Sequence, residues 1–437
     1  MRSETVLFYT PSITSRIRYI ASHLISEILG ARLQFTNNFD EACSSELPLI
    51  NYSDTTVKKA LNIYAEGLLT ETGIRKEKPV PDYLEGLTVF YPSVSDDFGF
   101  DIFSSSFFML SRYEEYMQYR KDIHGRFPYN ESLACRYSLE EEPLVDLWAE
   151  KLQVALKRMF PAVYFPEREF TFIPTIDADI PWAYRNRGVW RTAGGLARSI
   201  LKGDIQKIRS RCNVIFGEEP DPFDTFGFME ELHRHYDASP LFFFPAGTYG
   251  KYDKCISCEN PGYRRLIKDL SGKYRWGIHP SYRSFGNVKL LRKEAGILKD
   301  ITGDAPARSR SHFLRFEFPE TGRMLERIGI IEDYTIGWAE LPGFRAGTCT
   351  PFLFYDIGEE RISSLRLFPF QLMDGTLCDY MKLSAAEAAE ESMKIITKVQ
   401  NARGTLITLW HNESFSESGR WKNWRNVYNE VINAATQ

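Results

Sequence analysis

Two carboxylates stand two residues apart after a β-rich apolar run in the segment FTFIPTIDAD, residues 170–179. Side chains at positions i and i+2 of a strand point the same way, so Asp177 and Asp179 would face one cavity if the extended backbone persists. Two negative charges this close are unfavourable unless a cation or a proton lies between them. The segment therefore predicts an acid–base or metal site, and a solvated strand end is the alternative.

More polar side chains stand where later predicted strands end. Three of the seven histidines, His279, His312 and His411, occur in the segments GIHPSYRS, RSHFLRF and TLWHNES. The segments RSHFLRF and EDYTIGWAE also carry Arg310 and Asp333. In α/β barrels the chemistry sits where strands end and loops begin. These residues are therefore candidates for a single site.

The elements that would position this site alternate between strand and helix beyond about residue 165. Such alternation predicts parallel strands in an α/β sheet or barrel. Pro174 suggests that the first strand lies at an edge or seam. We predict a small α/β domain over residues 1–165 and a larger one over residues 166–437, with strands in the second at 170–176, 241–245, 274–278, 309–314, 330–335, 367–373 and 405–410.

Composition limits the classes of function. The chain has 437 residues, 43% apolar and 26% charged, with a net charge of −4, which is globular and gives no reason to expect nucleic acid or an anionic membrane surface as partner. No apolar run reaches the roughly 18 residues of a membrane span, and the N-terminus lacks the pattern of a secretory signal. We expect a cytoplasmic protein. The seven cysteines, including the pair Cys255 and Cys258, are expected to be ordinary thiols.

The order and wording of the strand ends resemble the NodB-homology polysaccharide deacetylases, carbohydrate esterase family 4, over about residues 170–437. The resemblance implies an incomplete (β/α)7-type barrel and removal of an acetyl group from an N-acetylated sugar of a glycan or glycan precursor. It also implies a divalent metal, with zinc as the expected ion, which would polarise the acetyl carbonyl and acidify a bound water.

The first two family motifs would supply the base and the metal ligands. The segment TIDAD matches the first motif, which implies that Asp177 is the general base and Asp179 a ligand. In HPSYRS, His279 matches the first histidine of the second motif, whereas Arg283 occupies the position of the second histidine. We expect His312 to replace the missing ligand and Arg283 to reach toward substrate.

The remaining motifs would position the base and supply the acid. In RSHF, Arg310 matches the arginine that orients the catalytic aspartate. In DYTIGWAE, Asp333 matches the aspartate that orients the catalytic histidine, and Trp338 would form a wall on which the sugar stacks. In LITLWH, His411 would protonate the leaving amine and Leu409 would form a wall of the pocket.

One further substrate contact comes from the residues alone. In GFRAGTCTPFLFYD, Gly343 and Gly347 bracket Arg345, so this loop could present a guanidinium to an anionic sugar or phosphate, or it could be a tight turn.

Two other functions stay open at this stage. A barrel without metal could bind carbohydrate without turning it over. The presence of Arg283 where the family has a histidine ligand suggests this function. A glycoside hydrolase could use Asp177 with a second carboxylate such as Asp333 or Glu340, and it would need no metal. The sequence does not identify the sugar, the acyl group, the oligomeric state or the role of residues 1–165.

Overall fold

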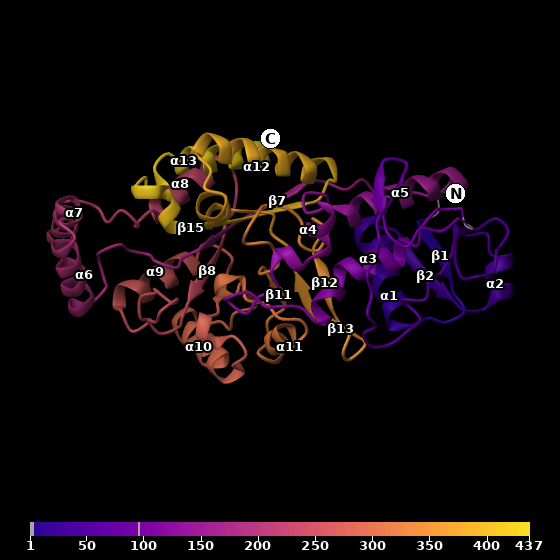
Figure 1. The fold of residues 1–437 in the computed structure, drawn as a ribbon, viewed down its shortest axis with the longest axis horizontal. Helices are drawn as coiled ribbons and strands as arrows, with labels where there is room; N and C mark the ends of the chain where they lie inside the picture. The colour runs from indigo at the N-terminus through magenta and orange to yellow at the C-terminus, as the bar shows by residue number, and fades with distance from the viewer. Residues whose placement is uncertain (1–3, 95–96) are drawn as a thin grey trace.

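The computed structural model describes residues 4–94 and 97–437. Figure 1 shows an elongated molecule with a small sheet near the N-terminus, a large sheet in the middle and a helical hairpin at the opposite end. Among the described residues, no helix is long and apolar enough to cross a membrane.

The small sheet is parallel, with the strand order β2-β1-β3-β4. Its first strand, TVLFY, is β-branched and aromatic, and four of its five residues are buried. The elements here are β1 (Thr5–Tyr9), α1 (Ser15–Ala21), a π-helix (Ser22–Ile28), β2 (Arg32–Thr36), α2 (Phe39–Ser44), β3 (Leu49–Tyr52), β4 (Leu61–Ile63), the hairpin β5 (Asp82–Leu84) and β6 (Leu87–Val89), α3 (Ile102–Leu110), α4 (Leu133–Tyr137) and α5 (Leu144–Met159).

The large sheet has nine strands in the order β12-β13-β11-β10-β9-β8-β7-β15-β14. All neighbours are parallel except β12 and β13, which confirms the prediction of an α/β fold with parallel strands. The strands are β7 (Thr171–Asp177), β8 (Leu241–Pro245), β9 (Trp276–His279), β10 (Arg308–Ser309), β11 (Glu332–Asp333), β12 (Phe352–Asp356), β13 (Arg361–Leu367), β14 (Leu372–Met373) and β15 (Thr405–His411).

The helices that cover this sheet follow the strands in sequence. An example is α12, which begins with a capping box in which Ser384 and Glu387 bond each other's backbone. The helices are α8 (Phe226–His235), α9 (Pro261–Ser271), α10 (Val288–Thr302), α11 (Glu320–Arg327), α12 (Ala385–Asn401) and α13 (Trp424–Thr436).

The two ends of the large sheet are connected by one short segment, residues 368–371. The backbone N–H of Phe368 donates to the carbonyl of Asp333 in β11, and that of Gln371 donates to the carbonyl of Ile407 in β15. The segment therefore contacts strands on both sides of the gap. No continuous ladder closes the sheet within the described residues, so the seven-stranded barrel stays a prediction.

Strand β7 lies inside the sheet, between β8 and β15, and the outermost strands are β12 and β14, so the expectation that β7 lies at an edge or seam is wrong. Pro174 is tolerated because the pairing with β8 begins only at Thr175, which leaves β15 as the one neighbour beside the proline.

The N-terminal part packs firmly on the large sheet. Arg16 of α1 is buried and forms an ion pair with Glu360 at 2.5 Å. Arg345 donates to Glu115, whose side chain is fully buried. Buried ion pairs with this geometry fix the relative position of the elements that carry them.

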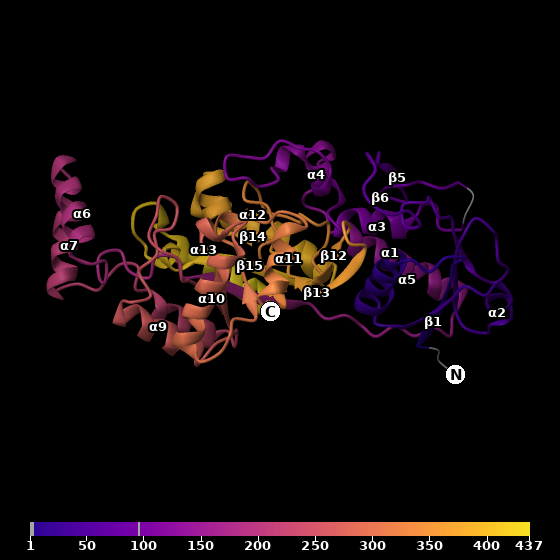
Figure 2. The same cartoon turned by 90° about the horizontal axis from the view of Figure 1, so that it is seen from below.

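An unexpected insertion separates β7 from α8. It contains α6 (Val189–Leu201) and α7 (Ile205–Phe216), and Figures 1 and 2 both show these helices side by side, projecting from the end of the molecule farthest from the N-terminus. No helix is among the elements predicted for this stretch from the sequence.

Candidate metal and proton-transfer site

The site is built where parallel strands end. Strands β7, β9 and β15 end at Asp177, His279 and His411, and Arg310 and His312 follow β10 directly. Since these strands are neighbours or near neighbours in one sheet, their ends meet at the same edge. This arrangement brings together side chains from positions 177 to 411 of the chain.

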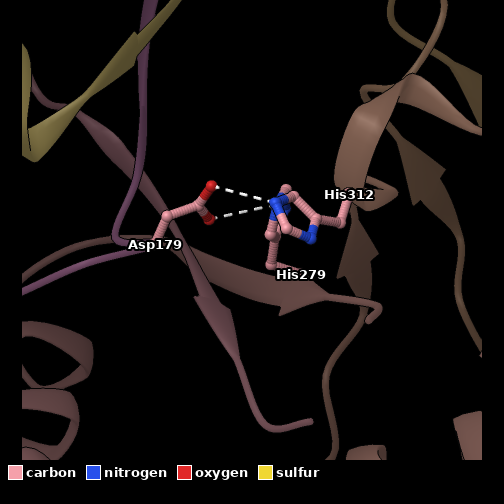
Figure 3. Close-up of side chains that lie close together, drawn as sticks. All are labelled: Asp179, His279 and His312. Carbon is pink, nitrogen blue, oxygen red and sulfur yellow. Dashed lines mark ion pairs between the residues drawn. The ribbon is translucent and has the colours of Figure 1, made fainter. Parts of the chain in front are cut away.

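One carboxylate and two imidazoles form the centre of the site. An oxygen of Asp179 lies 3.2 Å from Nε2 of His279, and its other oxygen lies 3.3 Å from Nε2 of His312, as Figure 3 shows. The ligand atoms of these three residues all lie within 4.8 Å of one another. They are the three residues for which the sequence predicts metal ligation.

The charged groups at this centre shift one another's pKa values. Burial would raise the pKa of Asp179, but the neighbouring His279 and His312 hold it far below its ordinary value. Burial would likewise lower the pKa of His312, and the carboxylates of Asp179 and Asp253 outweigh that effect and raise it to about 9. Burial lowers the pKa of His279, which stays below its ordinary value despite the nearby aspartates.

The donor atoms fit a divalent cation. Oδ1 of Asp179 and both ring nitrogens of His279 are buried and have no hydrogen-bond partner within the described residues. Buried polar atoms normally have partners, so these atoms indicate a site completed by something that the chain does not supply. Two imidazole nitrogens and a carboxylate oxygen are the ligand types of catalytic zinc sites, which keep a further position open.

A second carboxylate supports one of these imidazoles from behind. Nδ1 of His312 lies 3.0 Å from Oδ1 of Asp253, and the same oxygen accepts a hydrogen bond from the backbone N–H of Tyr282 at 2.8 Å. Such a partner fixes the orientation of the ring and directs Nε2 toward Asp179. No sequence pattern marks Asp253 as a site residue, because it lies in the loop after β8 rather than at a strand end.

The candidate base is held by a buried arginine. Arg310 donates from Nη1 to Oδ1 of Asp177 at 3.1 Å and to Oγ1 of Thr175 at 2.6 Å, and from Nε to the carbonyl of Tyr334 at 3.0 Å. Both Arg310 and Asp177 are almost completely buried. The geometry is the one that the resemblance implies, with the arginine orienting the aspartate.

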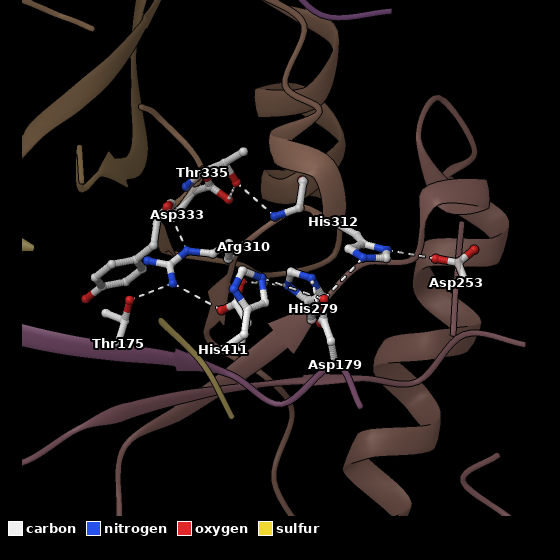
Figure 4. A network of polar contacts seen from close by, with 12 residues as sticks. Thr175, Asp179, Asp253, His279, Arg310, His312, Asp333, Thr335 and His411 are labelled. Atoms are coloured by element: carbon white, nitrogen blue, oxygen red, sulfur yellow. Dashed lines mark hydrogen bonds and ion pairs between the residues drawn. The ribbon is translucent and has the colours of Figure 1, made fainter. Parts of the chain in front are cut away.

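The candidate acid has a different partner from the expected one. Asp374 accepts from the backbone N–H of His411 at 2.7 Å, and its other oxygen lies 2.8 Å from Nδ1 of the ring. Burial would lower the pKa of His411, but the charge and hydrogen bond of Asp374 raise it well above its ordinary value. Figure 4 shows His411 and His312 on opposite sides of Asp179.

The prediction that Asp333 orients His411 is therefore corrected. Asp333 accepts hydrogen bonds from Ser309 at 2.6 Å and from Thr335, and burial raises its pKa to about 6. The reason is the strand order: β14 is the neighbour of β15, so the residue after β14 reaches His411, whereas β11 lies on the far side of the sheet.

Three of the four predicted substrate contacts lie elsewhere. Trp338 is only 2% exposed, and its ring packs against Phe127 and Tyr129. Arg345 is equally buried and serves Glu115. Arg283 is exposed and lies 3.4 Å from Oγ1 of Thr248, away from the three ligand candidates.

Leu409 does line the cavity above the site, which has a volume of 240 Å³. Its wall includes Arg126 from the N-terminal part, which donates to Asp122 and to the carbonyl of Phe313. Glu413 is also in the wall, where burial raises its pKa to about 7. Apart from the site residues, the other polar or aromatic lining residues are Ser311, Phe313, Asp379, Tyr380, Arg420 and Trp421.

Comparison with known families finds one match, to a family of unknown function (DUF7033) over residues 6–161. No curated protein matches this chain.

Solved structures resemble this chain only distantly. They include a protein assigned as a polysaccharide deacetylase from Mycobacterium smegmatis, with 15% identity and a TM-score of 0.39, covering 62% of this chain and 86% of that one. A peptidoglycan N-acetylglucosamine deacetylase catalytic domain from Eubacterium rectale has 11% identity and a TM-score of 0.29, covering 62% and 85%. A carbohydrate esterase family 4 pseudoenzyme from Bacillus anthracis has 12% identity and a TM-score of 0.28, covering 60% and 61%.

Proposed function

We propose that this protein is a metal-dependent hydrolase that removes an acetyl group from an N-acetylated sugar of a glycan or glycan precursor. The observation that carries the proposal is the cluster of Asp179, His279 and His312. Oδ1 of Asp179 and both ring nitrogens of His279 form no hydrogen bond within the described residues, and the cluster faces Asp177 on one side and His411 on the other.

Amide hydrolysis needs help at both ends of the scissile bond, because resonance makes the carbonyl a poor electrophile and an amine is a poor leaving group. A divalent cation, with zinc as the expected ion, would polarise the acyl carbonyl and acidify the attacking water. Asp177, oriented by Arg310, would accept the proton of that water. His411, held by Asp374, whose carboxylate raises the pKa of the imidazole, would then protonate the departing nitrogen.

The two alternative functions are less well supported. A glycoside hydrolase would need a second carboxylate facing Asp177 across the cavity. Asp333 is fully buried against Ser309 and Thr335, and Glu340 lies near Arg126 outside the cavity wall. A binding barrel without metal would leave the unpartnered atoms of Asp179 and His279 unexplained.

The domain organisation and the location of the protein belong to this proposed function. We propose that residues 1–165 form one domain and residues 166–437 an incomplete (β/α)7 barrel, which the bonds of segment 368–371 to both β11 and β15 support. The N-terminal domain would complete the cavity wall with Arg126. Cytoplasmic action on a glycan precursor is the corresponding proposal for location.

Elemental analysis of protein purified without chelators tests the metal. We expect about one divalent ion per chain in the wild type and in Arg283→Ala, and loss of the ion in Asp179→Ala, His279→Ala and His312→Ala. Acetate release from N-acetylglucosamine oligosaccharides should follow the metal content. A wild type that neither carries metal nor takes it up on titration would overturn the proposal.

A further inference from the structure

Most of the helical hairpin of α6 and α7 is not packed against the rest of the described chain, although Arg191 of α6 donates to the carbonyls of Lys254 and Cys255. Each helix buries a single residue, Ser199 in α6 and Val214 in α7. Figure 2 shows the pair standing clear of the helices that cover the large sheet. Helices of this length usually gain their stability by packing an amphipathic face against another surface, so we expect an external partner to cover the exposed faces.

The exposed apolar side chains on the hairpin are large. Trp190 is 90% exposed, Leu201 88% and Phe216 77%. Trp190 and Leu201 are eleven residues apart, which is three helical turns, so they lie on one stripe of α6. Val189, Ile200, Ile205 and Ile215 are exposed on the same two helices.

The hairpin also carries a concentration of positive charge that the rest of the chain lacks. Residues 185–217 contain eight Lys or Arg residues and one acidic residue, in a protein whose net charge is −4. The single acid, Asp204, is paired with Lys207 at 2.8 Å. In the described part of the chain, Arg198, Lys202 and Arg209 form no ion pair, so their charge is available to an external anion.

Several of these cations line a hollow of 580 Å³ between the hairpin and the body of the protein. Its lining also includes Ile180, which follows the candidate ligand Asp179 in the chain, and Tyr249 and Lys254 from the loop after β8. The lining cations are Arg187, Arg191, Arg198, Lys202, Lys207 and Arg211.

We propose that the α6–α7 hairpin docks this protein on an anionic lipid surface. An interfacial helix combines large apolar side chains, which enter the acyl boundary, with Lys and Arg, which meet the headgroup phosphates. A nucleic acid would use the cations but leave the exposed Trp190, Leu201 and Phe216 in water. A second copy of the chain would cover the apolar stripe but does not require so many unpaired cations.

Flotation of the full-length protein with vesicles tests this docking. We expect the wild type to float with vesicles of phosphatidylcholine containing phosphatidylglycerol, and to bind pure phosphatidylcholine vesicles far more weakly. The triple variant Arg198→Ser, Lys202→Ser, Arg209→Ser should lose on the order of 100-fold in partitioning at low salt, about fivefold for each cation. The triple variant Trp190→Ser, Leu201→Ser, Phe216→Ser should lose binding at any salt concentration.

Matched controls are exposed residues far from the hairpin. Lys289, Arg292 and Lys293 on α10 provide three equivalent cations, and Val80 and Tyr83 provide exposed apolar side chains. Substituting these residues with Ser should leave partitioning within about twofold of the wild type. Unaltered circular dichroism of every variant would show that the fold is retained, since all the substituted side chains are exposed.

Four results would overturn the proposal. The wild type could fail to float with anionic vesicles, or the control variants could lose as much binding as the hairpin variants. Sedimentation could show a dimer that dissociates in the Trp190→Ser triple variant, or the wild type could bind duplex DNA more tightly than vesicles. None of these measurements involves metal or deacetylation, so the outcome is independent of the proposed function.

Discussion

The two sides of the candidate cavity differ in how their ligand, acid and base groups are held. On the ligand side, Oδ1 of Asp179 and both ring nitrogens of His279 are buried and form no hydrogen bond among the described residues. On the proton-transfer side, Asp177 is held by Arg310, and His411 by Asp374. Buried polar atoms without a hydrogen bond are costly, whereas a hydrogen-bonded acid or base has a fixed orientation. The ligand side is thus suited to taking up an ion, and the proton-transfer side to moving protons.

His312 and His411 lie on different sides of the cavity but are held in the same way. Each imidazole has an aspartate at Nδ1, Asp253 and Asp374 respectively, and each directs Nε2 toward Asp179, at 3.3 Å for His312 and 3.8 Å for His411. The same type of Asp–His pair would therefore occur twice, with His312 binding the metal and His411 donating a proton.

The largest expected effect separates the two carboxylates of TIDAD. Asp177→Asn should lower kcat for acetate release by about 10³-fold or more, because it removes the general base while keeping its shape. Its metal content should equal that of the wild type, whereas Asp179→Asn should lose both activity and metal. Elemental analysis and an acetate assay on the same preparations measure this. Loss of metal from Asp177→Asn would mean that the two sides are not distinct.

The next effect distinguishes Asp374 from Asp333. Asp374→Asn should lower kcat roughly 100-fold with little change in KM, because His411 loses the carboxylate that orients and charges it. Asp333→Asn should leave kcat within severalfold once the fraction of folded protein is corrected for. Steady-state kinetics with thermal unfolding of both variants gives the answer, and the opposite ranking would restore the assignment made from sequence.

A smaller effect is expected behind the ligand side. Asp253→Asn should weaken metal affinity 10- to 100-fold, because carboxylates that hold a ligating imidazole typically contribute that much. Competition with a chelator measures the affinity directly, independently of turnover. Asp379→Asn is a suitable control, since this exposed residue lines the cavity without contacting a ligand candidate. Equal affinities in both variants would remove Asp253 from the site.

Much of the site could be predicted because strand-end chemistry is visible in a sequence. Asp177, Asp179, His279 and His411 lie at or just after the ends of β-rich runs, and parallel strands bring such positions to one edge. His312 was expected as a replacement ligand only because Arg283 stands where the family has a histidine. The strands themselves were found where they are long and apolar, as at Leu241–Pro245.

The rest depends on information that a single sequence does not contain. The partner of His411 follows from β14 being next to β15, and strand order cannot be read from local patterns. Trp338 and Arg345 resemble substrate contacts in sequence, but tertiary packing buries them against the N-terminal part. The net charge of −4 likewise conceals a strongly basic hairpin, because an average over the whole chain removes local contrast.

The smallest predicted effect concerns an imidazole that lacks any carboxylate partner. His233 is buried in α8, with Nδ1 2.7 Å from the carbonyl of Met229 and Nε2 2.7 Å from the hydroxyl of Tyr428. Burial lowers its pKa to about 4, in contrast to the raised pKa of His312 and His411.

A folded-state pKa below the unfolded value of about 6.5 means that the unfolded chain takes up a proton first as the pH falls. His233 therefore stabilises the folded protein fully above pH 6.5 and loses that contribution between pH 6.5 and about 4. The loss should be on the order of 1 kcal/mol at pH 5.5. Denaturant unfolding across this range should give a shallower pH dependence for His233→Gln than for the wild type, and an unchanged one for His235→Gln, which alters an exposed position on the same helix. If the unfolding free energies of the wild type and His233→Gln depended equally on pH, the imidazole would be taking up its proton in the folded state as readily as in the unfolded chain, despite its burial. The lack of a carboxylate partner would then not explain how His233 differs from His312 and His411.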